Sequence, residues 1–392
     1  MGVRALSLTA VNQTVGVGIF GLPAVAAAAL GPAAVVAYLA CAGIIGLVGL
    51  CLAEAGSRVS APGGLYAYAG AAFGPLAASF VGTLSWLGNS VIANAAVGVL
   101  LASTIGRVVP TLTLPIPRAL FLAGMYAVLA WVNVRAVRDG VGLSVVLTVL
   151  KLLPLVLLVL VGLPQVHFEL LRWQSAPSIA NVAKTTVVLV FAFSGIEGAL
   201  SASGEVHEPA RTIPRAILAT IALITVLYIG LQVVAQGILG PALAGAGETP
   251  LVSVARVTLG AAGATLLTVA VGLSAAGFLS ADVLTGPRVL YALALDGLLP
   301  RPLSAVHPTF RTPAVAIVVY AALAALFAIS GTFARLAFIS AAATLLSYLV
   351  CSIGVLRLRS RGIRGEQVPF IVPGGPIVPI VTGVTILALI SS

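Results

Sequence analysis

The sequence predicts an all-α polytopic membrane protein, and three observations lead to this class. Hydrophobic residues make up 60% of the 392 residues, only 8% are charged, and the mean hydropathy is +1.18. Apolar stretches of about 20 residues, the length that crosses a bilayer, recur along the chain. A soluble protein covers its surface with roughly 25–35% charged residues, so a soluble fold is excluded. Disorder, a coiled coil and a secreted disulfide scaffold are excluded with it.

Charged residues and Gly/Pro clusters divide the chain into eleven predicted spans. In order they cover residues 6–29, 32–55, 75–104, 118–134, 141–163, 182–204, 213–239, 250–280, 313–330, 335–356 and 376–391. Two connections are expected to carry structure of their own: an interfacial helix within 56–74, and an amphipathic piece bounded by prolines within 286–312. At the end of the second span, Glu54 and Arg58 are expected to form an ion pair.

The distribution of the basic residues predicts the orientation. With the N-terminus inside, thirteen basic residues fall in cytoplasmic segments, six fall in outer segments, and Lys151 stays within a span. This bias follows the positive-inside rule, so we expect a multi-pass protein of the cytoplasmic membrane. The net charge is +10, but the sequence contains no run of basic residues interleaved with aromatics. We therefore expect the partner to be the lipid bilayer rather than nucleic acid. Three cysteines without ligand spacing predict no metal site.

Two spans are interrupted at corresponding places. The first contains TVGVGIFGLP from Thr14 to Pro23, and the sixth contains FAFSGIEGALSASGE from Phe191 to Glu205. Glycine-rich breaks at membrane depth are tolerated only where they face protein or water. Five helices per unit force the second unit into opposite topology, and paired breaks in inverted halves mark the binding site of a secondary transporter. The G-x-G-x-x-G at Gly16–Gly21 lacks the context of a dinucleotide site.

Five motifs together resemble one family. They are TVGVGIFGLP, the P-G-G-x-Y-x-Y of Pro62–Tyr68, FAFSGIE, EVHEPARTIPRAI and GPRVLYALALDGLLP. In this order they resemble the amino acid–polyamine–organocation superfamily, and within it the bacterial-type amino acid permeases. The resemblance implies an inverted five-plus-five helix fold with broken helices 1 and 6. We expect a ten-helix transport core over residues 1–375, with repeats at about 5–165 and 182–357. An eleventh helix follows at 376–392, and the chain ends where a twelfth span would begin.

Unwinding a helix exposes N–H groups and carbonyl groups that bind ions of opposite charge. A substrate carboxylate is therefore expected on the N–H groups of Val17, Gly18 and Ile19. The α-amine is expected on the carbonyls of Thr14, Phe191 and Ser194, and the resemblance points to the same places. Side-chain selectivity is expected from Phe191, Ser194 and Asn89. Plain packing remains the alternative for Phe191, and a hydrogen bond to a neighbouring helix remains the alternative for Asn89.

Two charged residues within spans suggest proton coupling. A carboxylate at membrane depth is costly unless it is protonated or paired, so Glu197 is expected to bind and release a proton. Lys151 lies in the fifth span, and the resemblance implies that it replaces a sodium ion and bridges span one to span eight near Ser274. The alternatives are a structural acid at Glu197 and a Lys151 side chain that extends towards the cytoplasm.

The expected function is secondary active transport of neutral amino acids by alternating access, with the proton as coupling ion and no cofactor. An amino acid/polyamine exchanger is the alternative, and a nontransporting membrane sensor or assembly subunit is the alternative from another class. An enzyme is not expected, because the chain contains no Ser–His–acid arrangement or paired membrane carboxylates. A homo-oligomer is left open.

Overall fold

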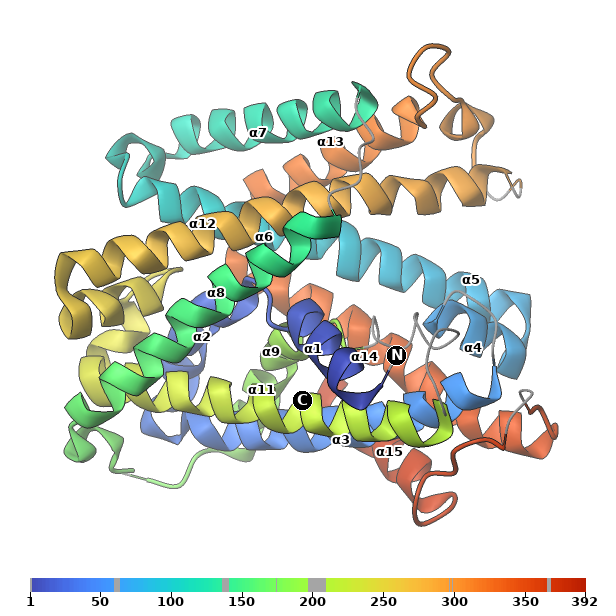
Figure 1. The fold of residues 1–392 in the computed structure, drawn as a ribbon, viewed down its shortest axis with the longest axis horizontal. Helices are drawn as coiled ribbons and strands as arrows, with labels where there is room; N and C mark the ends of the chain where they lie inside the picture. The colour runs from blue at the N-terminus through green and yellow to red at the C-terminus, as the bar shows by residue number, and fades with distance from the viewer. Residues whose placement is uncertain are drawn as a thin grey trace.

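The computed structural model describes residues 2–59, 64–135, 141–173, 175–196, 209–295, 297, 299–364 and 368–392. Every regular element within these ranges is a helix (Figure 1). Six helical stretches are long and apolar enough to cross a membrane, and four shorter helices are also apolar. The predicted all-α class is confirmed for the part of the chain that the structure describes.

The first predicted span is two helices joined by a short irregular segment. α1 covers Val3–Thr14 and α2 covers Gly18–Leu30. A turn at Gly31, whose φ of 53° suits glycine, leads into α3, Ala34–Arg58. The interfacial connection forms the short helix α4, Leu65–Phe73.

The third predicted span contains a feature that the sequence did not indicate. α5, Pro75–Leu84, continues into a π-helical segment, Ser85–Ile92, and then into α6, Ala93–Gly106. Gly88 permits close packing here, because a Cβ at this residue would lie 2.3 Å from the Cβ of Ala343. Single π-helical turns occur frequently at functional sites.

The remaining helices follow the predicted order of apolar segments. They are α7, Pro115–Arg135; α8, Val141–Gly162; α9, Ile179–Phe193; α11, Pro209–Leu239; α12, Pro250–Leu295; α13, Ala314–Ser330; α14, Phe333–Ser360; and α15, Ile377–Ile390.

The helix of the eighth predicted span continues beyond residue 280, where the span was predicted to end. α12 bends at Gly260, where φ is 68°, and then continues through Pro287 to Leu295. The Gly286–Pro287 pair predicts the start of a connection, yet packing against α6 and α13 holds this length helical. Tertiary contacts of this kind allow a proline inside a membrane helix. Asp282, which that boundary assigns to a cytoplasmic segment, therefore lies within the helix.

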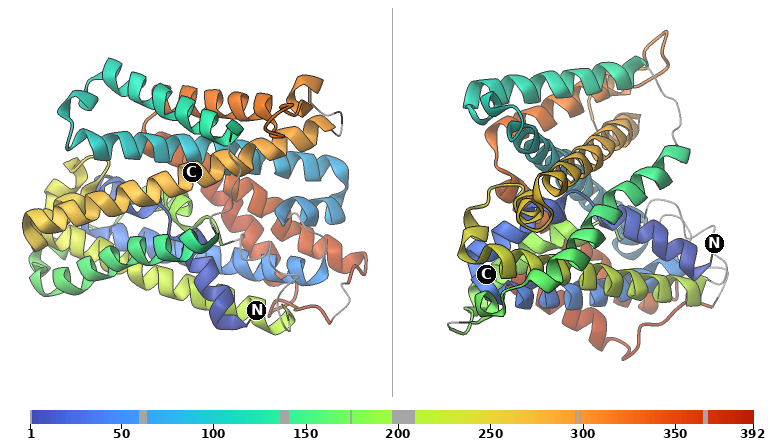
Figure 2. Two further views of the ribbon diagram at one scale, coloured as in Figure 1. Left: turned by 45° about the horizontal axis from the view of Figure 1, so that its top comes forward. Right: turned by 60° about the vertical axis from the view of Figure 1, so that its left-hand side comes forward.

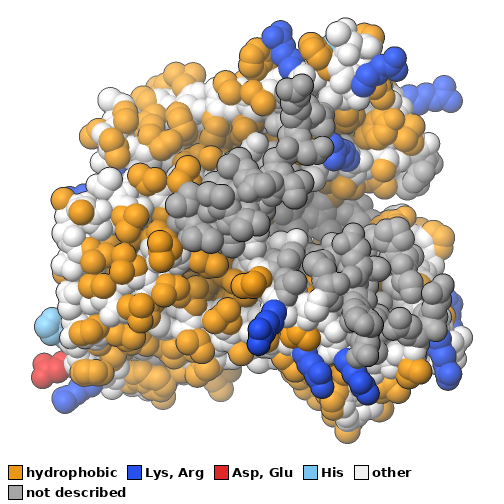
Figure 3. All heavy atoms as spheres, in the orientation of Figure 1, with side chains coloured by type: hydrophobic (Ala, Val, Ile, Leu, Met, Phe, Trp, Pro, Cys, Tyr) orange, Lys and Arg blue, Asp and Glu red, His pale blue; other side chains and the backbone are white. Residues whose placement is uncertain are grey.

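Long helices form the bundle, and shorter ones fill its centre. α7 and α13 lie side by side next to α6 and α12, while α3 and α11 pair at the opposite side (Figures 1 and 2). Between these groups, α9 packs against α2, α3 and α14. On the face in Figure 3, hydrophobic side chains cover much of the left-hand half, and most Lys and Arg side chains lie towards the right. The apolar exterior suits contact with lipid.

Glu54 joins the ends of several elements. Its carboxylate is fully buried and accepts hydrogen bonds from Arg58 at 2.9 Å and from Arg359 at 2.6 and 2.8 Å. It also accepts the backbone N–H of Val372 at 2.8 Å. The predicted Glu54–Arg58 pair is confirmed, and Arg359 from α14 extends it. This cluster fastens α3, α14 and the segment before α15 together.

Candidate functional site

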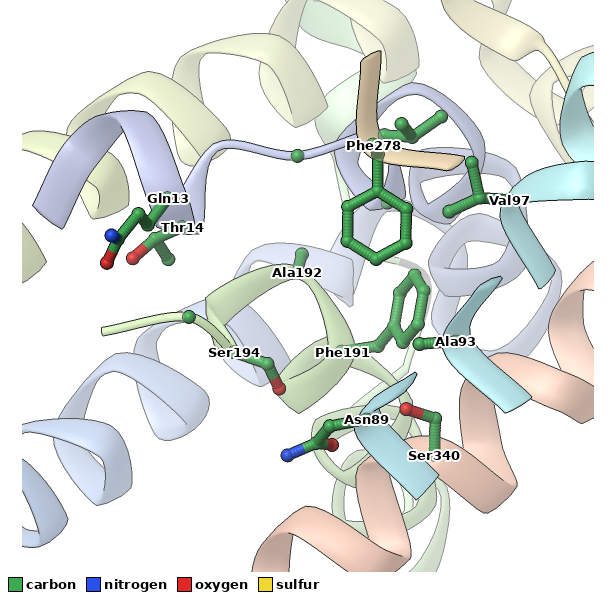
Figure 4. Close-up of a pocket in the computed structure, with 14 residues that line it drawn as sticks. Gln13, Thr14, Asn89, Ala93, Val97, Phe191, Ala192, Ser194, Phe278 and Ser340 are labelled. Carbon is green, nitrogen blue, oxygen red and sulfur yellow. The ribbon is translucent and has the colours of Figure 1, made fainter. Parts of the chain in front are cut away.

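A cavity of about 150 Å³ lies where the break between α1 and α2 meets the end of α9 (Figure 4). One water needs only about 10–15 Å³, so this space admits a small ligand. The residues that line it come from the α1–α2 break, the third span, the end of α9, α12 and α14: Gln13, Thr14, Gly16, Val17, Gly18, Asn89, Ala93, Val97, Phe191, Ala192, Ser194, Gly195, Phe278 and Ser340.

The break between α1 and α2 redirects one backbone hydrogen bond. The N–H of Gly16 donates to the Thr14 carbonyl at 2.8 Å, instead of to the Asn12 carbonyl four residues earlier. The freed Asn12 carbonyl accepts a hydrogen bond from Lys151 Nζ at 2.5 Å. A cation at the C-terminal end of a helix is favoured by the helix dipole.

The start of α2 leaves N–H groups available beside the cavity. The first N–H groups of a helix have no partner within it, and no hydrogen bond within the described part of the chain uses those of Val17, Gly18 or Ile19. Gly18 brings this helix end against Phe191, because a Cβ there would lie 2.9 Å from the Phe191 ring. This wall of the cavity therefore presents free N–H donors and the positive end of a helix dipole, without a cationic side chain.

The end of α9 crosses the end of α1 at Gly195. Gly195 has φ of 107°, and a Cβ at this residue would lie 2.6 Å from the Gln13 carbonyl oxygen. Only glycine meets both conditions. Tyr228, on α11, donates from its buried hydroxyl to the Ala192 carbonyl at 2.9 Å. The break between α1 and α2 and the end of α9 are thus held in contact.

Aromatic rings form the apolar part of the wall. Phe191 and Phe278 both line the cavity, and Figure 4 shows their rings projecting into the same space. Phe333, at the start of α14, meets Phe191 edge-on with ring centroids 6.0 Å apart. This geometry is a favourable aromatic contact. Phe191 therefore both packs against a neighbour and borders the cavity.

Polar side chains occupy the side of the cavity next to α14. Asn89, from the π-helical segment, lines the cavity, and its Oδ1 accepts a hydrogen bond from the Thr344 hydroxyl. The alternative of a hydrogen bond to a neighbouring helix is thus observed, and the binding role of Asn89 stays a prediction. Ser194 Oγ donates to the Val190 carbonyl at 2.9 Å. The Thr14 hydroxyl is buried and has no partner within the described residues.

The structure brings six of the seven predicted substrate-site residues to one cavity: Thr14, Val17, Gly18, Asn89, Phe191 and Ser194. The seventh, Ile19, was predicted through its backbone N–H, and its side chain is fully buried in the core. Glu197 lies outside the described residues. Lys151 turns inward to α1, and the structure records no hydrogen bond between the described Lys151 and Ser274.

Several lining residues were not predicted. Phe278 and Ser340 lie within apolar spans that contain many similar residues, so neither stands out in the sequence. Gln13, next to the first break, could have been predicted from the sequence, because a polar side chain within an apolar span faces protein or water.

Comparison with known proteins identifies the family. The profile of the family described as amino acid permease matches residues 1–392. A methylthioribose transporter of Bacillus subtilis (strain 168) is 28% identical over 96% of this chain and 84% of its own length. The serine/threonine exchanger SteT of that bacterium is 29% identical, over 96% of this chain and 86% of its own length. The branched-chain amino acid permease BcaP of the same bacterium is 26% identical, over 97% of this chain and 84% of its own length.

The fold defines a polytopic helical membrane protein, with a cavity between the break in its first span and the end of α9. The chain belongs to the amino acid permease family of the amino acid–polyamine–organocation superfamily.

Proposed function

We propose that this protein is a secondary transporter of small neutral amino acids that works by alternating access. The observation that carries the proposal is the contact between the α1–α2 break and the end of α9 at one cavity, with Gly195 packed on Gln13. A ligand held at this point touches both segments at once, so a movement of either changes its exposure to one side of the membrane.

The chemistry of the wall matches a zwitterion. The N–H groups at the start of α2 suit an α-carboxylate, and carbonyls at the ends of α1 and α9 suit an α-amine. Phe191, Phe278, Ala93 and Val97 offer apolar contact to a substrate side chain. No described lining residue carries a charge, which favours a neutral substrate over a charged one.

We infer that the transport is proton-coupled symport. Lys151 supplies a cation to the Asn12 carbonyl at the α1 break, and a change in its protonation would weaken that contact. Glu197, two residues after Gly195 in sequence, is proposed as the second proton-binding group. We also propose that the protein lies in the cell membrane with its N-terminus in the cytoplasm. Residues of about 5–165 and of about 182–357 would then form the two halves of an inverted repeat.

Exchange is the second candidate, because one relative is named a serine/threonine exchanger. Another is named a methylthioribose transporter, so substrates differ among relatives and must be measured.

Uptake of labelled amino acids into proteoliposomes tests the proposal. Symport predicts uptake that an inward proton gradient accelerates in empty vesicles. Exchange predicts uptake that requires an amino acid or amine inside and ignores the gradient. If no amino acid or amine moves under any gradient or internal load, the transport proposal fails.

A further inference from the structure

A second polar cluster joins the third, eighth and ninth apolar segments beside the cavity. Asp282, on α12, places its Oδ1 within hydrogen-bonding distance of Ser90 Oγ, at 2.9 Å. Its Oδ2 accepts from Asn94 Nδ2 at 3.0 Å and from the Tyr320 hydroxyl. No ion pair between described residues includes Asp282. This carboxyl group is therefore surrounded by neutral hydrogen-bonding groups.

The oxygen contacts in this cluster form a closed ring. In addition to the two contacts with Asp282, Ser90 Oγ and Tyr320 Oη are 3.0 Å apart. Each hydroxyl carries one proton, and an ionised carboxylate carries none. With an ionised Asp282, only the two hydroxyl protons are available for the three oxygen–oxygen contacts of the ring. One contact would then have no proton, and lone pairs of its two oxygens would face each other. A neutral Asp282 supplies the third proton, donates from Oδ1 to Ser90 and leaves every contact with one proton.

The surroundings contain no described positive charge that would replace that proton. The titratable groups facing Asp282 are two tyrosines: Tyr320 from α13, and Tyr126 from α7 through hydrogen bonds of 2.9 Å to Asn94. The third span contributes the neutral side chains Ser90 and Asn94. On α12 itself the nearest arginine, Arg288, is exposed, and the described lysine of α8, Lys151, bonds to α1.

Close packing keeps the ring assembled. Gly286 lies one turn after Asp282, and a Cβ there would lie 2.5 Å from both Ser90 Oγ and a Tyr320 ring carbon. The Trp86 indole N–H also donates to the Gly286 carbonyl at 3.1 Å. The π-helical segment is therefore fastened to α12 at two points around the ring.

The ring is directly connected to the substrate cavity. Ser90 follows Asn89, which lines the cavity, and Asp282 lies one helical turn after Phe278, which lines it from α12. We propose that Asp282, Ser90 and Tyr320 form a proton-binding site in which Asp282 is held as the neutral acid, and that this proton keeps the π-helical segment in the position that presents Asn89 to substrate. The site is separate from Lys151 and Glu197.

Infrared spectroscopy tests the protonation state directly. The full chain in lipid vesicles is compared with Asp282→Asn at neutral pH, and we expect the difference spectrum to contain the carbonyl stretch of a protonated carboxylic acid. The control Glu248→Gln removes a carboxylate that pairs with Arg118 at 3.1 Å, and its difference spectrum should lack that band. A wild-type minus Asp282→Asn spectrum without the band overturns the proposal.

Ligand binding tests the connection to the cavity. Asparagine donates an N–H where the neutral acid donates an O–H, so Asp282→Asn should retain amino acid affinity within about twofold at neutral pH. At alkaline pH, wild-type affinity should fall more steeply than that of Asp282→Asn, because the substrate amine titrates with both proteins and Asp282 only in the wild type; equal pH dependence would overturn the connection. This readout rests on the proposed amino acid substrate, but the infrared band does not, so the two proposals fail independently.

Discussion

At the scale of single residues, the break in the first span leaves a backbone carbonyl without its helical partner, and a side chain distant in sequence bonds to it. The break frees the Asn12 carbonyl, and Lys151 reaches it from α8. A lysine in an apolar span is tolerated when it has such a partner and faces the interior of the bundle. The alternative in which the side chain extends towards the cytoplasm is not the arrangement observed.

Lys151→Met should uncouple uptake from the proton gradient. Methionine keeps much of the side-chain volume but cannot donate to Asn12, so the free energy of unfolding should also fall by about 1–3 kcal/mol. Proteoliposome uptake with and without a pH gradient measures the first effect, and denaturant unfolding in detergent measures the second. Lys184→Met, at an exposed lysine on α9, is the matched control and should resemble wild type. Unchanged pH dependence in Lys151→Met would remove its proposed role.

Gly195→Ala should destabilise the protein and reduce amino acid affinity. A Cβ would meet the Gln13 carbonyl at 2.6 Å, and the φ of 107° disfavours any side chain, at a cost of order 1–3 kcal/mol. Thermal unfolding and equilibrium binding measure the two effects.

Gly31→Ala is the matched control for Gly195→Ala. Gly31 also has positive φ, at 53°, but no atom lies within 4 Å of the place that a Cβ would take. It should therefore lower stability without changing affinity. Equal loss of affinity in both variants would show that the contact between the α1–α2 break and the end of α9 does not shape the site.

At the scale of elements, the buried Glu54 carboxylate connects parts of the chain that the apolar pattern treats as separate. Arg58 belongs to the same helix, but Arg359 comes from α14 and Val372 precedes α15. Paired charges resist separation because each would be left unpaired in a poorly solvated place. The predicted pair was local in sequence; the residues that complete it are more than 300 positions away.

Glu54→Gln should lower the free energy of unfolding by about 3–5 kcal/mol, because two arginines lose their counter-charge. Glu248→Gln is the comparison, since the Arg118–Glu248 pair is 30% and 25% exposed and such pairs contribute about 0–1 kcal/mol. Unfolding of both variants in detergent gives the ranking. Equal losses would contradict the role assigned to burial at Glu54.

The third span contains a π-helical segment that its sequence pattern does not predict. Its apolar composition predicted the helix, and Asn89 was singled out within it. The π-helical turn depends on contacts with α14 and α12, such as the approach of Gly88 to Ala343. The end of α12 was missed for the same reason, because neighbouring helices, and not local propensity, hold it beyond Pro287.

At the scale of the whole molecule, the bias of basic residues predicts a cytoplasmic N-terminus. Cysteines introduced at Ser175 and at Ser360, both exposed, should lie on opposite sides of the membrane. In intact cells, a membrane-impermeant maleimide should label Ser175→Cys and not Ser360→Cys. The native cysteines are buried, so the parent chain serves as the unlabelled control. The reverse labelling pattern would invert the predicted topology.

The amino-acid sequence by itself determined the membrane class, the order of the helices and the first interruption, because hydropathy and glycine content act locally along the chain. It also identified six residues that share the cavity, through the two breaks and the family motifs. The tertiary structure alone decided which polar groups meet: Lys151 with Asn12, Glu54 with Arg359, and Asp282 with Ser90 and Tyr320. These partners are separated by tens to hundreds of residues. Only the packing of helices brings them within hydrogen-bonding distance, where a buried charge or proton becomes stable.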